Sequence, residues 1–309
     1  MEDGSKISGN SSSGEDDGGG LFVNGGSFTM SGGEISGNDD GGVYVNDGDF
    51  TMNGGEISGN DGGGVWVGAS GGFTMNGGEI TGNSSSLGGG VSVSYRVNTG
   101  NTTYTGGEFT MTGGTISGNT AYNYGGGVYV GQDDFDSGYG NIGNAIFIMS
   151  GGTISDNSAT LGGGVLVNNG RFTMNDGEIS GNSDGGVWVG ARGDFTMNGG
   201  EITGNTASSN GGGGVYVGQV DFPIRDGSGY LGRAIFIMSG GTISDNSASG
   251  YMCAGGGVFV SDDGDFTMSD GEISGNSVSG GGRPGGVYVN AGGSFTQSGG
   301  TISDKVTHE

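Results

Sequence analysis

Cysteine, proline and basic residues are scarce in this sequence. Its 309 residues include one cysteine, Cys253, and two prolines, so internal disulfides and a cysteine zinc site are excluded. Only 8 Lys and Arg stand against 33 Asp and Glu, which gives a formal net charge of −25. A surface of this sign repels phosphates, so we expect no nucleic-acid partner and no anionic membrane partner. No apolar run is long enough to span a bilayer, and no membrane insertion by this segment is expected.

Glycine, in contrast, is abundant, with 83 copies placed regularly inside a repeated phrase. The phrase has the form Phe-Thr-Met-x-Gly-Gly-Glu-Ile-Ser-Gly-Asn, and Gly-Gly-Val-aromatic-Val follows nearly every copy. The copies are 22 to 41 residues apart and begin at Phe28, Phe50, Phe73, Phe109, Phe147, Phe172, Phe195, Phe236, Phe266 and Phe295. A constant phrase with variable gaps is typical of a solenoid whose insertions leave as loops, here residues 94–107, 131–146 and 218–235.

The phrase predicts short β-strands. Apolar residues alternate with polar ones in Phe50-Thr51-Met52 and flank the central position of Val65-Trp66-Val67, and a period of two indicates a strand. Three such strands in each coil would lie beside their equivalents in the next coil. Because parallel crossovers are overwhelmingly right-handed, we predict an all-β, right-handed parallel β-helix. Residues 1–309 would form one domain of about ten coils, similar in architecture to pectin lyases.

A glycine position that turns the chain and an asparagine column beside it are expected to support this stack. Gly59 ends the Ile-Ser-Gly part of the phrase, and Asp156 and Asp245 replace glycine there, as residues that tolerate left-handed backbone. The next residue is asparagine in nearly every coil, and stacked amides would each find a donor and an acceptor. We assign this structural Asn ladder to Asn38, Asn60, Asn83, Asn119, Asn157, Asn182, Asn205, Asn246 and Asn276, with Lys305 at the position where it would stop.

Catalysis is not expected, although β-helices include polysaccharide lyases and hydrolases. Lyases of acidic sugars need clustered Arg or Lys, and here the eight basic residues are scattered. Glycoside hydrolases need two carboxylates in distinct environments, whereas the acids of this chain recur from coil to coil. The only histidine, His308, lies at the end of the chain. An ice-binding rod would carry two outward threonines on each strand; Phe-Thr-Met offers one.

An outward column of acids, with Glu34, Glu56 and Glu79 in successive coils, raises the question of calcium. Further oxygen ligands stand in the 131–146 insertion, at Asp133, Asp134 and Asp136. Neither the nonapeptide calcium repeat nor a complete calcium loop is present. We therefore expect no cofactor and a solvated acidic face; weak calcium binding at the three aspartates is left open.

Aromatic residues are the candidates for recognition. The middle position of Val-x-Val predicts an outward row, formed by Tyr44, Trp66, Tyr129, Trp188, Tyr216 and Tyr288. Exposed aromatics on a rigid face suit sugar or protein binding; alternatively, loops cover them. Where Ile148 and Ile237 replace the outward threonine, a long insertion precedes the coil and is expected to cover the isoleucine. The recognition residues of these two loops would be Phe135, Tyr139, Phe222 and Tyr230.

The repeated phrases resemble those of the polymorphic outer-membrane-protein family of bacterial autotransporter adhesins. That family alternates a Gly-Gly-Ala-aliphatic tetrad with Phe-x-x-Asn. The second tetrad is matched at Phe50–Asn53, Phe73–Asn76, Phe172–Asn175 and Phe195–Asn198; elsewhere Ser or Thr replaces its asparagine, and Val follows the glycines in place of Ala. The resemblance implies a secreted or surface-exposed passenger, whose secretion signal would lie outside this chain.

Taken with the absence of a catalytic cluster, these features predict a non-catalytic bacterial surface or secreted protein that acts as an adhesin stalk, a scaffold or a self-associating fibre unit. Its partner would be a host or neighbouring-cell protein or glycan. Unpaired strand edges at the two ends would favour end-to-end association. A carbohydrate-binding or carbohydrate-active β-helix is the alternative, with an ice-binding solenoid behind it.

Overall fold

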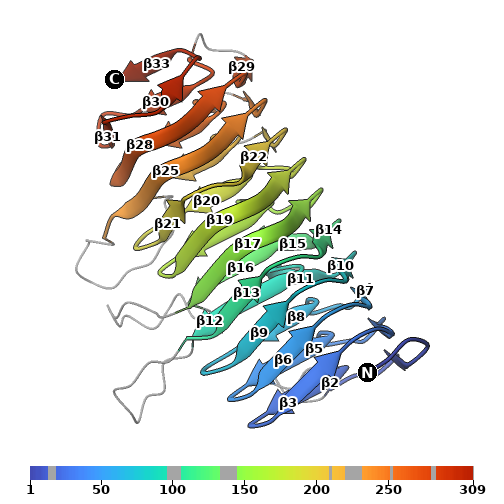
Figure 1. Ribbon diagram of the computed structural model, residues 1–309. Helices are drawn as coiled ribbons and strands as arrows, with labels where there is room; N and C mark the ends of the chain where they lie inside the picture. Colours follow the sequence, from blue (N-terminus) through green and yellow to red (C-terminus); the bar gives the residue numbers. More distant parts are fainter. Residues whose placement is uncertain are drawn as a thin grey trace.

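The chain forms a parallel β-helix, in which strands from successive coils lie one above another along a rod (Figure 1). The computed structural model describes residues 1–12, 19–95, 106–132, 145–208, 211–219, 232–250, 253–279 and 283–308. No helix occurs among these residues, and every strand pair is parallel. The prediction of an all-β parallel solenoid is confirmed.

The largest sheet has 17 strands and contains both the Phe-Thr-Met and the Glu-Ile-Ser parts of the phrase. In most coils the two parts are separate strands. The Phe-Thr-Met strands are β3 (Ser27–Met30), β6 (Asp49–Met52), β9 (Gly72–Met75), β13 (Glu108–Met111), β21 (Asp194–Met197) and β31 (Ser294–Gln297). The Glu-Ile-Ser strands are β1 (Lys6–Ser8), β4 (Glu34–Ser36), β7 (Glu56–Ser58), β10 (Glu79–Thr81), β14 (Thr115–Ser117), β22 (Glu201–Thr203) and β32 (Thr301–Ile302).

In four coils the two parts join into one long strand: β17 (Ile146–Ser155), β19 (Arg171–Ser180), β25 (Ala234–Ser244) and β28 (Gly264–Ser274). Two of these carry Asp176 or Asp270 in place of the first glycine, and each carboxylate accepts the backbone N–H of the next glycine at 2.8 Å. This bond satisfies a backbone donor locally, but β17 and β25 are equally continuous with a glycine pair at this place.

The second sheet contains the Val-x-Val parts and has 11 strands. They are β2 (Leu21–Asn24), β5 (Val43–Asn46), β8 (Val65–Val67), β12 (Val91–Tyr95), β16 (Val128–Gln132), β18 (Val165–Asn168), β20 (Val187–Val189), β24 (Val215–Val217), β27 (Val258–Val260), β30 (Val287–Val289) and β33 (Val306–His308). Sequence reasoning missed two small further sheets, which follow the Asn ladder: β11 (Ser84–Leu87) with β15 (Thr120–Tyr124), and β23 (Thr206–Ala207) with β26 (Ser247–Ser249) and β29 (Ser277–Ser279).

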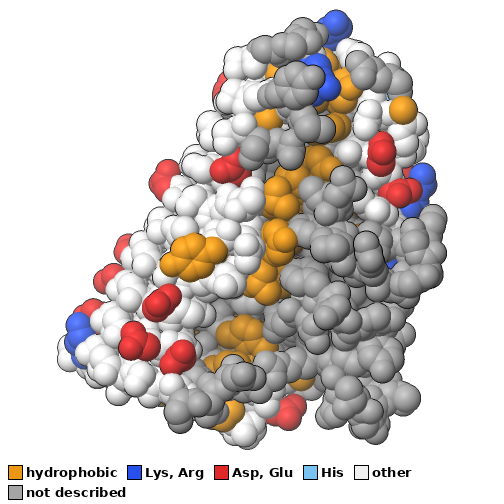
Figure 2. All heavy atoms as spheres, turned by 180° about the vertical axis from the view of Figure 1, so that it is seen from behind, with side chains coloured by type: hydrophobic (Ala, Val, Ile, Leu, Met, Phe, Trp, Pro, Cys, Tyr) orange, Lys and Arg blue, Asp and Glu red, His pale blue; other side chains and the backbone are white. Residues whose placement is uncertain are grey.

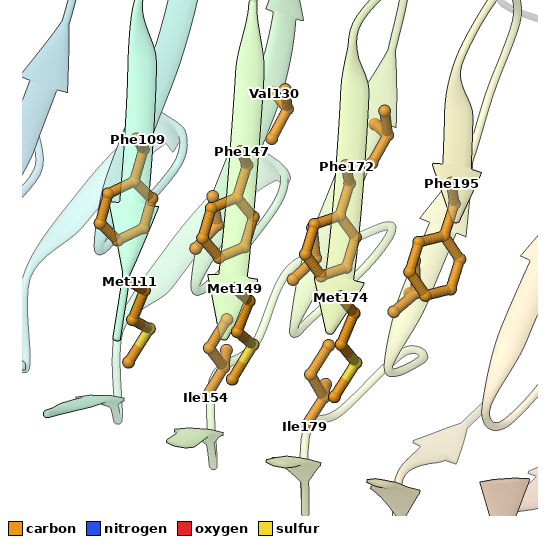
Figure 3. Close-up of a cluster of buried hydrophobic side chains, with 14 of the residues drawn as sticks. Phe109, Met111, Val130, Phe147, Met149, Ile154, Phe172, Met174, Ile179 and Phe195 are labelled. Carbon is orange, nitrogen blue, oxygen red and sulfur yellow. The ribbon is translucent and has the colours of Figure 1, made fainter. Parts of the chain in front are cut away.

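The core consists of columns of one residue type. Phe109, Phe147, Phe172 and Phe195 stack at centroid distances of 4.6 to 4.8 Å with nearly parallel rings (Figure 3). Columns of Met, Ile and Val continue beside them, and nearly all of these side chains are fully buried. Thr51, Glu56 and Ser58 are partly exposed. The alternation of the sequence therefore gave the correct inward and outward faces.

Two backbone positions show why the phrase requires glycine. Gly152 has φ +87°, and a Cβ there would lie 2.6 Å from Cε of Met111 in the preceding coil. A Cβ on Gly127 would lie 2.8 Å from Cγ2 of Ile154 and 3.0 Å from Nδ2 of Asn157. Asp156 and Asp245 both have φ 56°, so the predicted left-handed backbone at these two replacements is confirmed.

Candidate binding surfaces

The Asn ladder lies inside the rod, as predicted. Each amide donates from Nδ2 to Oδ1 of the next asparagine; the bond from Asn157 to Asn182, for example, is 3.0 Å long. The same Nδ2 also donates to a backbone carbonyl of the preceding coil, as Asn157 does to Ile116 at 3.0 Å. Asn119, Asn157, Asn182, Asn205 and Asn246 are fully buried. Because their hydrogen bonds remain within the column, these amides hold the coils together and offer nothing to a ligand.

The ladder of amides stops after Asn276, as predicted, and a carboxylate that was not predicted follows it. Lys305 occupies the position of the asparagine, but Asp304 replaces the amide: its Oδ2 accepts from the backbone N–H of Asn276 at 2.9 Å and from Nδ2 at 3.1 Å. The ladder thus ends on a carboxylate. The repeat pattern did not indicate this acceptor, because Asp304 stands one residue before the asparagine position of the phrase.

The aromatic row is a single column on the outer face of the second sheet. The strand register pairs Phe22 with Tyr44, Tyr44 with Trp66, and Trp188 with Tyr216. Ser92 and Leu166 occupy two levels of the same column. The alignment expected from the sequence is present.

Of the two alternatives that the sequence left open, exposure of this row or cover by other segments, cover is the one found for most of its length. Tyr129, Trp188, Tyr216 and Tyr288 are at most 5 % exposed. Leu87, Tyr124, Leu161 and Ala254 pack against them, from segments that follow the Asn ladder, and Figure 2 shows the resulting band of hydrophobic side chains along this side of the rod. The Tyr129 hydroxyl donates to the carbonyl of Gln132 at 2.7 Å, and Tyr216 does the same to Gln219 at 2.8 Å. These four rings are part of a second core.

Only the first part of the row reaches solvent. Phe22 is 43 % exposed, and Tyr44 and Trp66 are partly exposed. Tyr44 and Trp66 stack at 4.0 Å and 17°, while Phe22 meets Tyr44 edge to face at 5.2 Å. The amides of Asn24 and Asn46 are joined at 3.4 Å beside them. Phe22, Tyr44 and Trp66 form a three-ring group at the partly exposed end of the aromatic column.

The loop residues predicted for recognition, Phe135, Tyr139, Phe222 and Tyr230, lie outside the described residues. So do the three aspartates considered for calcium, Asp133, Asp134 and Asp136. Most of the two insertions that were expected to cover the outward isoleucines also lies outside the described residues. Ile237 itself is 42 % exposed.

The acidic column is real but does not form a metal cluster. Glu56 pairs in register with Glu34 on one side and with Glu79 on the other. At the end of this column Lys6 bonds Glu34 at 2.8 Å. Hydrogen bonds from Lys6 and then from Ser36 lower the pKa of Glu34 below its ordinary value. Within the described residues, no three His, Cys, Asp or Glu side chains converge as metal ligands would.

A hollow of about 370 Å³ lies on the outer face of the large sheet, across β6, β9 and β13. It arises because Gly72 has no side chain, while its register neighbours are Asp49 and Glu108. Thr74 and Thr110 also line it. This open, polar hollow offers hydroxyls and carboxylate oxygens to water or to a donor group. The glycine before Phe73 is the sequence signal that could have indicated it.

None of the described segments is a helix able to cross a membrane. No family model, curated protein or solved structure matches this chain. The likeness to autotransporter adhesins therefore rests on the repeated phrases alone.

Proposed function

We propose that this chain is a non-catalytic rod that serves as a scaffold or adhesin stalk, secreted or displayed on a cell surface. The observation that carries the proposal is the continuity of its internal columns across the insertions. Phe109 and Phe147 flank the 131–146 insertion and stack at 4.6 Å, while Phe172 and Phe195, with no such insertion between them, stack at 4.8 Å. The rod keeps its spacing whatever loop leaves it.

Such a rod suits the presentation of loops at fixed separations. The 11 strands of the second sheet, at about 4.8 Å per step, span roughly 50 Å. Loops on a rigid solenoid are the usual place of recognition. With a net charge of −25, the rod favours neutral or basic partners on a host or neighbouring cell, either protein or glycan.

Labelling of intact cells of the source organism tests the proposed location. Antibodies against the rod should label unpermeabilised cells or detect the chain in the medium, and external protease should remove the surface signal. A chain detected only after lysis would overturn the surface proposal. Turnover of any polysaccharide by the purified chain would overturn its non-catalytic part.

Deletion of residues 133–144 tests the scaffold role. Because the Phe stack and the Asn ladder cross this level unbroken, the shortened chain should keep its melting temperature while losing partners that bind through this loop. A large loss of stability would show that the insertion belongs to the folded core.

Carbohydrate binding at the three-ring group of Phe22, Tyr44 and Trp66 is the second candidate. It is favoured by partly exposed rings beside the Asn24 and Asn46 amides, because sugars combine stacking with hydrogen bonds. The acidic rod selects against acidic glycans. Titration with neutral oligosaccharides should show binding that Trp66→Ala abolishes and that Tyr122→Ala, an exposed aromatic elsewhere, leaves unchanged. Equal binding by all three proteins would contradict it.

A further inference from the structure

Two pairs of isoleucines stand on the outer face of the large sheet. Ile146 and Ile148 belong to β17, and Ile235 and Ile237 belong to β25. Ile235 is 36 % and Ile237 42 % exposed, and the β17 pair is partly exposed. At the equivalent positions of the other coils the first residue is polar or glycine and the second is threonine. Apolar pairs repeated on one otherwise polar face indicate an interaction surface.

The strands between the two pairs complete a symmetric pattern. The register runs from β17 through β19 and β21 to β25. The first column across these strands reads Ile146, Arg171, Asp194, Ile235. The second column, extended by one strand on each side, reads Thr110, Ile148, Thr173, Thr196, Ile237, Thr267. This second column is the same in both directions, and the first has opposite charges at its two central positions.

We propose that this face binds a second copy of the chain, so that two rods lie face to face and antiparallel. Their two-fold axis would run parallel to the strands, midway between β19 and β21. Such an axis keeps the position along each strand and reverses the order of the strands. It places Ile146 opposite Ile235 of the second copy and Ile148 opposite its Ile237, so the same patch serves both partners, as a closed dimer requires.

The charges select this arrangement over its parallel alternative. In the antiparallel pair, Arg171 faces Asp194 of the second copy, and the same contact occurs twice. Parallel rods would need a two-fold axis along the rod, which reverses the position along each strand. With Ile146 opposite Ile148 of the second copy, Arg171 would then face Thr173 and Asp194 would face Thr196. Charges without a charged partner cost interface stability, whereas complementary charges fix the register. Figure 1 shows the four strands side by side on one face of the rod.

The size of the face and its acids make the dimer weak. Six strands at about 4.8 Å, with about four residues of 3.3 Å each, give a contact of roughly 400 Å² per copy, half of a standard interface of about 800 Å². On the two outer strands of this contact the first column continues with Glu108 and Asp265, which would face each other across the interface. Farther along the strands, Glu178 pairs in register with Glu201 and would face Glu201 of the second copy. Each copy also has a net charge of −25, so added salt should strengthen association by screening the repulsion.

Sedimentation equilibrium of the full chain, over a concentration series in moderate salt, provides the first test. A monomer–dimer equilibrium without larger species is expected. Ile237→Asp should weaken it about tenfold or more, since it buries a charge opposite Ile148. Thr29→Asp lies on the same column, at β3 and outside the contact, and should leave it unchanged. The double variant Glu178→Gln with Glu201→Gln should tighten the dimer. A strict monomer for this double variant would overturn the proposal. So would a series of oligomers of increasing size that Ile237→Asp does not affect, because end-to-end association would give that result.

Charge reversal provides the decisive test. Arg171→Asp and Asp194→Arg should each abolish self-association, because every central contact becomes one of like charges. When the two variants are mixed, all their central contacts join opposite charges, so a mixed dimer should form with about the wild-type affinity. Circular dichroism of each variant checks that it is folded. If two folded variants remain monomeric when mixed, the face does not pair as proposed.

Discussion

Asp304 and Asn276 are joined by two hydrogen bonds, in which the carboxylate takes the place of the next amide in the Asn ladder. Its Oδ2 accepts from the backbone N–H and from Nδ2 of Asn276, and its Oδ1 accepts from the backbone N–H of Gly275 at 3.1 Å. Each earlier asparagine of the ladder likewise donates its backbone N–H and its Nδ2 to Oδ1 of the next asparagine, as Asn246 does to Asn276 with both bonds at 3.0 Å. A carboxylate only accepts hydrogen bonds, so it fits where a column of donors ends.

Removal of this carboxylate should loosen the last coil. Asp304→Ala removes the acceptor of the backbone N–H groups of Gly275 and Asn276. Nδ2 of Asn276 loses one acceptor but still donates to the carbonyls of Ile243 and Ser274. Since the site is partly exposed, water replaces part of what is lost. We expect a decrease of about 1–2 kcal/mol in the free energy of unfolding, measured by urea denaturation. Lys305→Ala, at the neighbouring position, should have almost no effect. The reverse order of the two effects would show that Asp304 does not end the ladder.

A substitution inside the ladder should be far more costly. Asn157→Asp replaces a donor by an oxygen that faces two acceptors, Oδ1 of Asn182 and the carbonyl of Ile116, in a fully buried place. The expected loss exceeds about 3 kcal/mol. Asn76→Asp is the matched control: its Nδ2 bonds Asn53 at 2.9 Å in an exposed column, and Thr112 still has an acceptor there. Similar melting temperatures for the two variants would contradict the role of the buried amides.

The sequence was sufficient for the features that depend only on neighbouring coils. A period of two predicts which side chains of Phe50-Thr51-Met52 face the core, and identical residues in register then form the Phe and Asn columns. The left-handed backbone at Asp156 follows from its place in the phrase. Each of these features needs only the repeat and local backbone chemistry.

Features that depend on the variable segments could not be read in advance. Tyr129 and Trp188 occupy the same place in the phrase as the partly exposed Trp66, yet Leu87, Tyr124 and Leu161 cover the row beyond Trp66. These covering residues belong to stretches without a common pattern, so no period indicated them.

The inward and outward assignment predicts a large contrast between adjacent positions. Ile57→Asp places an unpaired charge in a fully buried column, at a cost of several kcal/mol. Glu56→Gln removes the repulsion from Glu34 and Glu79, its register neighbours, and is expected to be neutral or stabilising. Thermal unfolding of both variants gives the comparison. Equal losses would show that the two faces are assigned wrongly.

Asp194 should destabilise the monomer at neutral pH. Burial raises its pKa above the ordinary value, and the nearby Arg171 offsets only part of this. The folded state therefore holds the proton to a higher pH than the unfolded state does, so stability falls as pH rises through the interval between the two pKa values. At low protein concentration, Asp194→Asn should raise stability at neutral pH and lose that advantage in acid. Asp265→Asn loses an ion pair with Arg233 and should not stabilise. A pH-independent effect of Asp194→Asn would refute the linkage.

Calcium should stabilise the rod only slightly. The acids of the large sheet stand on separate coils, as Glu34, Glu56 and Glu79 do, and within the described residues no oxygen cage closes around an ion. The summed negative charge still attracts divalent cations. A ligand that binds only the folded state, with millimolar affinity, raises the free energy of unfolding by less than about 1 kcal/mol at a millimolar concentration. The melting temperature should therefore rise modestly. Magnesium should act almost equally, since summed charge does not distinguish the two ions. Folding that fails without calcium would overturn this prediction. A large effect of calcium but not of magnesium would also contradict it. If that effect were lost in the triple variant Asp133→Asn, Asp134→Asn, Asp136→Asn, the calcium site would lie in the 131–146 insertion.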